Sequence, residues 1–440
     1  MEGSLTESTQ QLVRPGQCVD LYYPDPETAQ KACIRTTQNT RYVQTFNNLS
    51  GGTNVFTVPP NNGVQDIVCS FGLPIGGGSG WATTTGLAVG RGWAYALIKQ
   101  ISFRYGGSSQ FFLSGQQVLQ TALSMCSDGA QRDGILSLGG SYTDAAGTAP
   151  ANFSTQQFGY VWLPLPHCVP SVVGKLPPIP SDLLTQQIQV TVELYPLSQI
   201  FTINANGLPT YVPTSLAVGQ FALQQVIMEN QGDALARRVD MTSHILSYPV
   251  NFRQQEIPIQ VAGGASVSPA TLGLQQVTLT GFRSGEIKEI HCWLTADSAN
   301  TPTPAVSTAQ NPFAWYPLTN VQLLYAGEVY ARGDYGSMQL WNLVNGRMTT
   351  QATDLLLTSG ATASTTVANA DGWTVLPFGQ SYSAETAHSM YVSGKQITNG
   401  IANLQFNIPT TAPTSTYTLH VSYVYNAVLS FSQGTCDYVF

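Results

Sequence analysis

Charged residues are scarce in this sequence. Asp, Glu, Lys and Arg make up 9% of the 440 residues, against roughly 25% in ordinary soluble domains. Long apolar runs are also missing, because every apolar stretch is short and broken by Gly, Pro or Thr, so no membrane-spanning helix is expected. Charge is depleted in the cores of protein–protein interfaces, and we therefore expect much of the surface to be covered by other protein chains. A Ser-, Thr- and Gln-rich surface that stays soluble through hydroxyls and amides is the alternative.

Basic clusters are missing as well. The 17 Lys and Arg residues are scattered, the longest cluster is the pair Arg237-Arg238, and the net charge is −7. A protein that grips nucleic acid carries a basic footprint that neutralises phosphates. The sequence therefore predicts no direct nucleic-acid binding, and its first forty residues do not form the basic arm of many RNA-virus coats.

Cysteine spacing excludes two kinds of site. The number of cysteines is odd, and no two are in C-x-x-C spacing, which argues against a disulfide framework and a zinc site. The N-terminal stretch "MEGSLTESTQQ" is too polar for the apolar core of a secretory signal. We expect reduced, mostly buried thiols in an intracellular setting. The seven cysteines are Cys18, Cys33, Cys69, Cys126, Cys168, Cys292 and Cys436.

Catalytic motifs are also absent. The five histidines form neither H-x-H nor H-E-x-x-H. The stretch "GGGSGW" around Ser79 fails the G-x-S-x-G pattern because Trp81 stands at its last position. His167 and Cys168 are adjacent, and neighbours on one strand point to opposite faces. The sequence predicts no enzyme, no catalytic residue, no cofactor and no metal ligand.

Two glycosylation sequons are present, Asn48-Leu49-Ser50 and Asn152-Phe153-Ser154. Asn48 and Asn152 are thus candidate modification sites. Because no secretion signal is visible, we expect both to be unmodified.

The sequence from Arg41 onward is dominated by β patterns. Apolar and polar residues alternate over short runs that are separated by Gly-Gly, Pro-Pro and Asn-Gly turn signals. Strands of this length suit an antiparallel sandwich better than a parallel sheet with crossover helices. Strands are predicted at 96–105, 158–166, 186–195, 216–228, 287–295, 318–325, 401–409 and 417–431; helices at 115–125, 231–245 and 334–346; and long projecting loops at 127–157 and 350–371.

One structural pattern occurs twice. "ISFRYGGSSQFFLSG" and "VQLLYAGEVYARGDY" each contain a strand, a Tyr-x-Gly turn, a second strand and a polar residue that opens a helix. Their tyrosines, Tyr105 and Tyr325, are 220 residues apart (325 − 105). Ser114 with Gln117 forms a capping box in the first copy, and Asp334 is the helix cap in the second. A second pair of similar segments, "VWLPLP" and "TVLPFG", is offset by 213 residues (376 − 163 for Leu376 and Leu163). We infer a β module of roughly 200 residues that is present twice.

These features resemble the double jelly-roll major capsid proteins of tailless icosahedral double-stranded DNA viruses. The resemblance covers most of the chain. It rests on "YGGSSQFFLSGQQVLQ", on "FALQQVIMENQGDALARRVDMTSHILSY" with Arg237, Arg238 and His244, on Lys288-Glu289-Ile290, on "SGKQITNGIANLQF", and on the closing "VSYVYNAVLSFSQG". The Pro-Glu that the family carries before its Ser-Gly is replaced here by "ETAHSMYVSG".

The resemblance implies an all-β fold of two consecutive antiparallel eight-stranded jelly-roll sandwiches with short helices in the loops. The predicted units are an N-terminal arm (1–37), a first jelly roll (38–243) and a second jelly roll (244–440). The implied function is a structural capsid protein whose homotrimers, pseudo-hexameric in outline, tile the shell of the virion and assemble inside the host cell. Implied partners are other copies, neighbouring capsomers, penton and minor cement proteins, and the resemblance leaves open an internal membrane beneath the shell. A two-domain β-sandwich that binds carbohydrates or receptors is the alternative, and a single jelly-roll RNA-virus coat and a cupin-type metal enzyme follow it.

Overall fold

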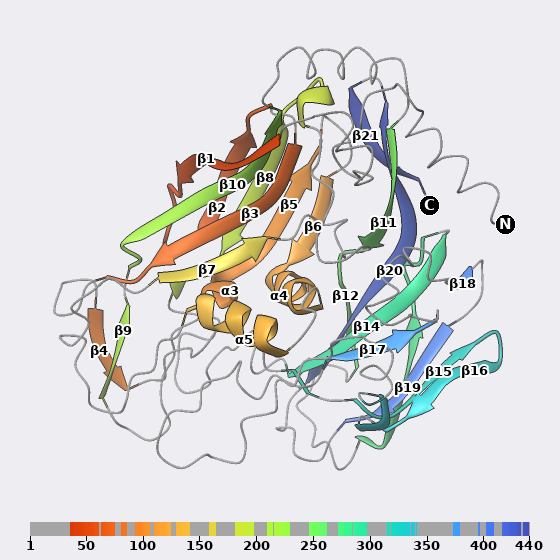
Figure 1. Ribbon diagram of the computed structural model, residues 1–440. Coiled ribbons are helices and arrows are strands. Elements are labelled where there is room, and N and C mark those ends of the chain that lie inside the picture. Colours follow the sequence, from red (N-terminus) through yellow and green to blue (C-terminus); the bar gives the residue numbers. More distant parts are fainter. Residues whose placement is uncertain are drawn as a thin grey trace.

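The computed structural model of the chain is built almost entirely from antiparallel strands (Figure 1). It describes residues 36–60, 63–74, 81–85, 93–105, 110–124, 129–140, 158–163, 181–197, 209–213, 215–228, 246–261, 272–283, 285–296, 315–316, 318–334, 336–338, 340, 373–378, 395–396, 402–408, 416–432 and 434–439.

Residues 36–228 form the first jelly roll, which packs two four-stranded sheets face to face. One sheet has the order β1-β10-β3-β7 and the other β2-β8-β5-β6. The short strands β4 and β9 pair separately, and three short helices lie beneath the sheets in Figure 1. The elements are β1 (Thr36–Thr45), β2 (Gly52–Val58), β3 (Gly63–Gly72), β4 (Trp81–Thr85), α3 (Trp93–Leu97), β5 (Ile98–Arg104), β6 (Gln110–Ser114), α4 (Gly115–Ser124), α5 (Gly129–Leu138), β7 (Phe158–Leu163), the 3-10 turn η2 (Ser181–Leu183), β8 (Ile188–Leu194), β9 (Pro209–Pro213) and β10 (Val218–Met228).

Residues 246–439 form the second jelly roll with the same strand order. Its sheets run β11-β20-β14-β17 and β13-β19-β15-β16. Three further strands extend the first of these sheets: β12 and β21 pair with β20, and β18 pairs with β14. The elements are β11 (Leu246–Arg253), β12 (Ile257–Gln260), β13 (Leu274–Leu279), β14 (Glu286–Ala296), β15 (Thr319–Tyr325), β16 (Glu328–Gly333), β17 (Thr374–Pro377), β18 (Lys395–Gln396), β19 (Ala402–Asn407), β20 (Tyr417–Ser432) and β21 (Thr435–Val439).

The two jelly rolls have identical topology. If the eight principal strands of each are numbered along the chain, both contain one sheet in the order 1-8-3-6 and one in the order 2-7-4-5. Two antiparallel four-stranded sheets connected in this way are a jelly roll. The predicted fold class, two consecutive jelly-roll sandwiches with short helices in the loops, is therefore confirmed.

The two copies also agree in register. Ile67 on β3 pairs with Leu163 on β7 and with Leu223 on β10. Ile290 on β14 pairs with Leu376 on β17 and with Tyr423 on β20. Leu163 and Leu376, the leucines of the second pair of similar segments, thus occupy equivalent positions in the two sheets.

Aromatic rings fill the space between the sheets of the first jelly roll. Phe56 on β2 stacks on Phe221 on β10 with ring centroids 4.2 Å apart and planes 5° apart. Phe46 lies edge-on to Phe56 at 4.8 Å and also contacts Phe71 at 5.0 Å. All four rings are buried, so the apolar positions of the alternating strands face the core as predicted.

The second Tyr-x-Gly hairpin is a two-residue turn. Tyr325 pairs with Glu328, and the two residues between them, Ala326 and Gly327, have φ of 52° and 85°. Positive φ at both positions is the geometry that matches the twist of a hairpin. The equivalent turn of the first copy, at residues 106–109, lies outside the described residues.

Two predictions on helices needed correction. The segment 127–157, predicted to be a loop, contains the helix α5, whose Leu136 is fully buried. The strand predicted from Ala96 begins at Ile98, because Trp93–Leu97 forms α3 with all five side chains buried. The predicted helix at 231–245 lies outside the described residues, as does the predicted loop 350–371.

The predicted division of the chain remains a prediction. Residues 1–35 and 229–245 lie outside the described residues, so the boundaries after residues 37 and 243 are not located. The sheets themselves separate as expected, because no strand from 36–228 pairs with a strand from 246–439 among the described residues.

Candidate functional site

The part of the chain that the structure describes contains no group of three His, Cys, Asp or Glu side chains able to hold a metal ion. None of its helices is both long and apolar enough to cross a membrane. The most densely bonded polar region is instead the junction between the two jelly rolls. It is built on helix α4, which follows the β5–β6 hairpin.

Helix α4 begins with the predicted capping box. Gln117 N donates to Ser114 Oγ at 3.3 Å, and Ser114 N donates to Gln117 Oε1 at 3.1 Å. These bonds satisfy backbone donors that the first turn of a helix leaves without partners. The glutamines of α4 are nevertheless buried: Gln117 and Gln120 are 0% exposed and Gln116 is 9% exposed. Buried amides need hydrogen-bond partners, and α4 finds several of them in the second jelly roll, although the Gln120 amide nitrogen has none among the described residues.

Gln116 receives hydrogen bonds from two tryptophans of the second jelly roll. Its Oε1 accepts from Trp315 Nε1 at 2.8 Å and from Trp293 Nε1. Both indoles are fully buried, so without this side chain each N–H would lose a buried hydrogen bond. One amide oxygen therefore satisfies two core rings that lie 177 and 199 residues further along the chain.

Gln117 joins the cap of α4 to the second jelly roll. Its Nε2 donates to the carbonyl oxygen of Gln254 and to Ser422 Oγ, both at 2.9 Å. Its Oε1 also accepts from Glu256 N at 3.3 Å. Ser114 Oγ in turn donates to Glu256 Oε2 at 2.7 Å. The cap residues of α4 are thus shared with the β11–β12 connection.

Arg253, at the end of β11, places a buried guanidinium against α4. It donates to Thr121 Oγ1 at 2.8 Å and to Gln120 Oε1. The side chain is 3% exposed. Burial lowers the pKa of Arg253 to about 10, while Glu289 and Glu256 raise it, so the group keeps its charge at neutral pH.

His291 completes this network, and its contacts define its tautomer. Its Nδ1 accepts from Trp373 Nε1 at 3.0 Å and lies 3.3 Å from the Arg253 guanidinium. Neither neighbour can accept a proton, so Nδ1 is the unprotonated nitrogen. The ring proton is therefore on Nε2, which lies 3.0 Å from Glu289 Oε1.

An aromatic cluster and a backbone contact strengthen the junction near the C-terminal strand. Tyr438 on β21 packs edge-on against Phe111 on β6 at 4.7 Å and against Phe252 on β11 at 4.8 Å. In the turn between β20 and β21, the Gly434 carbonyl accepts from Thr185 N at 2.9 Å. The last hairpin of the second jelly roll therefore contacts the first jelly roll, as Figure 1 shows at β21.

One group of residues resembles a hydrolytic triad in order but cannot act as one. Thr295 Oγ1 lies 2.9 Å from His420 Nε2, and His420 Nδ1 lies 3.5 Å from Glu256 Oε1. Thr295 is 1% exposed, and the His420 ring stacks on Trp293 at 5.4 Å. A nucleophile must reach its substrate, and this hydroxyl is enclosed. The arrangement is a buried hydrogen bond between Thr295 and His420, with the Glu256 carboxylate nearby.

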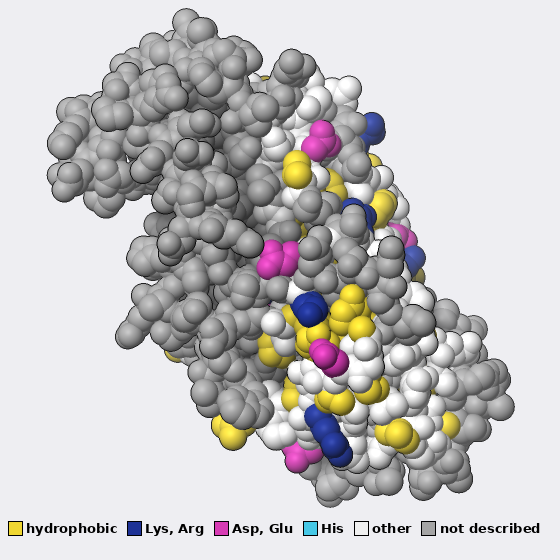
Figure 2. All heavy atoms as spheres, turned by 90° about the vertical axis from the view of Figure 1, so that its right-hand side faces the viewer, with side chains coloured by type: hydrophobic (Ala, Val, Ile, Leu, Met, Phe, Trp, Pro, Cys, Tyr) yellow, Lys and Arg dark blue, Asp and Glu magenta, His cyan; other side chains and the backbone are white. Residues whose placement is uncertain are grey.

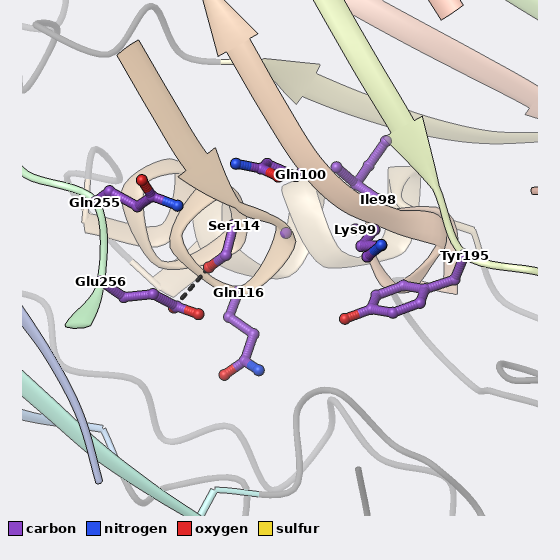
Figure 3. Close-up of a pocket in the computed structure, with 9 residues that line it drawn as sticks. Ile98, Lys99, Gln100, Ser114, Gln116, Tyr195, Gln255 and Glu256 are labelled. Atoms are coloured by element: carbon purple, nitrogen blue, oxygen red, sulfur yellow. Dashed lines mark hydrogen bonds between the residues drawn. The ribbon is translucent and has the colours of Figure 1, made fainter. Parts of the chain in front are cut away.

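Two polar pockets open beside the junction. One, of about 200 Å³, is lined by Lys99, Gln116, Tyr195 and Glu256 among others; Figure 3 shows the Tyr195 hydroxyl and the Glu256 side chain pointing toward the same space. The other, of about 190 Å³, lies between β6 and the 252–257 segment. Burial, then Glu256 and Glu193, raise the pKa of Tyr195 to about 12, so this group remains a hydrogen-bond donor at neutral pH.

The described surface in the view of Figure 2 carries few charged side chains, in agreement with the low charge content of the sequence. Figure 2 looks onto the side where β16, β18 and β21 lie in Figure 1, and most described side chains there are uncharged. Apolar groups lie between a few scattered charged ones. Eight large apolar side chains are exposed among the described residues: Val55, Leu138, Phe158, Tyr160, Leu274, Val329, Leu340 and Val439.

The residues singled out from the sequence have different outcomes. Asn48 is exposed, and its Nδ2, the atom that would carry a glycan, donates to the Thr53 carbonyl at 3.0 Å. That this candidate modification site is unmodified stays a prediction, and Asn152 lies outside the described residues. Cys69, Cys292 and Cys436 are free and buried as predicted. Arg237, Arg238, His244, the pair His167-Cys168 and Ser79 lie outside the described residues.

The junction residues were missed by sequence reasoning. The sequence identifies Gln117 only as part of the helix cap and does not single out Gln116 or Gln120, because a polar side chain on a helix is usually exposed. A signal was available in their spacing: positions 116, 117 and 120 share one face of a helix. An all-amide face without charge is a reasonable indicator of a buried polar contact.

Comparisons with known proteins agree with this architecture. No protein-family model matches the sequence, and no curated protein matches it. Among solved structures, a quasi-atomic model of the PBCV-1 virus capsid matches with a TM-score of 0.61 and 12% identity, over 92% of this chain and 97% of that chain. The mavirus major capsid protein matches with a TM-score of 0.51 and 11% identity, over 97% of both chains. The Faustovirus major capsid protein matches with a TM-score of 0.50 and 11% identity, over 91% of both.

The fold thus defines the class: a single chain of two jelly rolls held together by a buried polar junction. The structural neighbours of this chain are viral major capsid proteins, and the predicted resemblance to double jelly-roll capsid proteins is confirmed for the fold.

Proposed function

We propose that this protein is the major subunit of an icosahedral virus capsid. Three chains associate into a homotrimer with six similar jelly rolls, and these pseudo-hexameric capsomers tile the shell of the virion. The observation that carries the proposal is the end-to-end match of both jelly rolls to a PBCV-1 capsid chain, which leaves little of either chain unmatched.

The two-copy architecture supports a trimer on geometric grounds. Two jelly rolls of identical topology in one chain give six similar units when a threefold axis acts on the chain. Six such units fill a hexagonal position in a closed lattice. A single-domain protein would need six chains for the same outline.

The surface composition supports extensive contact between chains. A charged fraction of 9% fits protein surfaces that become interface cores, from which charge is depleted. Obligate interfaces of this kind bury on the order of 2,000 Å² or more. We therefore propose that the trimer persists on dilution and dissociates only under denaturing conditions.

The proposal also covers catalysis, partners and nucleic-acid binding. The protein acts as a structural component without catalysis and without cofactor or metal. Its partners are other copies, neighbouring capsomers, and penton and cement proteins, and an internal membrane beneath the shell is compatible with the fold. It does not bind nucleic acid directly, because its basic residues are few and scattered.

Negative-stain microscopy and analytical ultracentrifugation of the expressed protein test the proposal. Hexagonal-outline particles and a trimer mass at nanomolar concentration are the expected results. A folded monomer at nanomolar concentration, or a dimer at any concentration, would overturn the capsomer. Dispersed monomers that bind glycans would instead favour the alternative, a two-domain carbohydrate- or receptor-binding protein.

A further inference from the structure

The helix that follows the hairpin begins in the same way in both jelly rolls. Ser114 Oγ accepts from Gln117 N at 3.3 Å, and Asp334 Oδ1 accepts from Ser337 N at 2.7 Å. Each cap lies 220 residues from its counterpart, which is also the offset of the two hairpin tyrosines. Positions in the two segments can therefore be matched one by one.

The matched positions differ in one respect, their exposure. Gln120 in the first jelly roll is 0% exposed, because the second jelly roll covers it. Its counterpart, Leu340, is 62% exposed in the single chain. An apolar side chain is thus left open at a position where the equivalent polar side chain is covered.

The structure also identifies what covers Gln120. Arg253, which bonds to Gln120, lies on β11, the first strand of the second jelly roll, opposite Val424 on β20. Since Tyr423 is equivalent to Leu223, Val424 is equivalent to Gln224 on β10. Gln224 pairs with Thr40 on β1, the first strand of the first jelly roll.

The match extends to the residue type. The register of β1 shifts between Thr40 and Tyr42, so Arg41 stands at the irregularity next to the position equivalent to Arg253. β1 is an edge strand, because β10 is its only partner among the described strands. Each first strand therefore carries an arginine at nearly the same place in its sheet, and in the second jelly roll helix α4 of the same chain lies against that arginine.

We propose that the surface formed by Asp334, Ser337 and Leu340 at the end of β16 docks the β1 edge of a second copy of this chain. The contact repeats, between chains, the contact that α4 makes with β11 within the chain. This inference rests on the proposed capsomer and names the residues that join its subunits. Because the two contacting surfaces differ, three copies related by a threefold rotation close into a ring.

The change from Gln120 to Leu340 fits a contact between chains. Within one chain, a polar network can be satisfied by groups that fold together. Between chains, burying a leucine side chain stabilises association without requiring hydrogen-bond partners. Obligate interfaces are correspondingly apolar.

Leu340→Asp tests the docking surface, and Leu274→Asp is the matched control. Leu274 is 60% exposed on β13, which lies at the opposite edge of the same sheet from β16. Both changes place one carboxylate on an exposed apolar position, so neither should unfold the chain. We expect sedimentation at micromolar concentration to show folded monomers for Leu340→Asp, with at least a tenfold weaker association, and intact trimers for Leu274→Asp.

Photo-crosslinking identifies the partner surface directly. A photoreactive benzophenone amino acid at position 340 of the otherwise unchanged chain should form dimers by crosslinking to a peptide that contains Thr36–Thr45 of another copy. Mass spectrometry of the crosslinked peptides provides the readout. A crosslink that maps to any other segment would refute the docking surface. A Leu340→Asp variant that still forms intact trimers would also refute it. Neither result would refute the proposed capsomer. A wild-type chain that is monomeric throughout would refute both.

Discussion

The Arg253 guanidinium on β11 donates a hydrogen bond to the Gln120 amide on α4, and so joins two jelly rolls whose sheets do not pair with each other in the described part of the chain. The same guanidinium reaches Thr121 and His291. Replacement of Arg253 by Met removes these bonds and takes away the charged donor of the buried Gln120 Oε1. We expect the free energy of unfolding to fall by about 2–4 kcal/mol, measured by urea denaturation.

A surface ion pair is the control for this prediction. Lys99 Nζ lies 2.6 Å from Glu193 Oε1, with the lysine side chain 48% exposed. Lys99→Met should change the free energy of unfolding by less than about 1 kcal/mol, since exposed pairs contribute little. Equal losses in the two variants would contradict the structural role assigned to Arg253.

A comparison of Gly327 with Gly134 isolates the free-energy cost of a positive φ from the cost of steric clashes. A Cβ added at either position would meet no atom within 4 Å, but Gly327 has φ of +85° and Gly134 lies inside helix α5. Gly327→Ala should destabilise the fold by about 1–2 kcal/mol through strain alone. Gly134→Ala should be neutral or stabilising by up to about 1 kcal/mol.

Thermal unfolding of the two alanine variants decides this prediction. If Gly327→Ala melts at or above the wild-type temperature, the positive φ assigned to the turn is wrong. A valine at Gly327 should be worse than alanine, because a β-branched residue tolerates this region poorly. Gly107, in the equivalent turn of the first copy, lies outside the described residues, and from the sequence repeat we expect Gly107→Val to impair folding as well.

The buried thiols should resist alkylation in the native protein. Burial raises the pKa of Cys69, Cys292 and Cys436, and Asp437 adds to the effect at Cys436. The thiolate is the reactive form, so iodoacetamide at pH 8 should modify these positions only after denaturant is added. Peptide mass spectrometry gives the modified fraction at each cysteine.

The same pKa shifts predict a pH dependence. A folded-state pKa above the unfolded value means that the folded chain prefers the protonated thiol. This contribution to stability is fully present below the unfolded pKa of about 8.5 and is lost as the pH rises above it. Stability that increases between pH 8 and pH 10 would contradict the burial of these thiols.

Binding to nucleic acid should be weak. With a net charge of −7 and only 17 basic residues, few phosphates can be neutralised. Fluorescence anisotropy with duplex DNA at physiological salt should give no sub-micromolar affinity. Tight binding with a steep dependence on salt would show that basic side chains gather in a way the sequence does not reveal.

The sequence by itself determined the strands, the repeat and the helix caps. Alternation places Phe56, Phe221 and their neighbours in the core, because successive strand residues face opposite sides of a sheet. The 220-residue offset located the second hairpin, and the 213-residue offset located leucines that occupy equivalent sheet positions. Each strand, hairpin and cap is specified by residues that are close together in the sequence, so a local pattern can reveal it.

Only the tertiary structure decided what covers the polar face of α4 and where α5 forms. Gln117 is satisfied by Gln254 and Ser422, which are 137 and 305 residues away, and no local pattern encodes such distances. Helix α5 contains Gly134, which disfavours a helix by up to about 1 kcal/mol, and burial of Leu136 against the rest of the core offsets that cost. A sequence pattern reports which face of an element is polar or apolar, whereas the neighbour that face meets depends on how the whole chain packs.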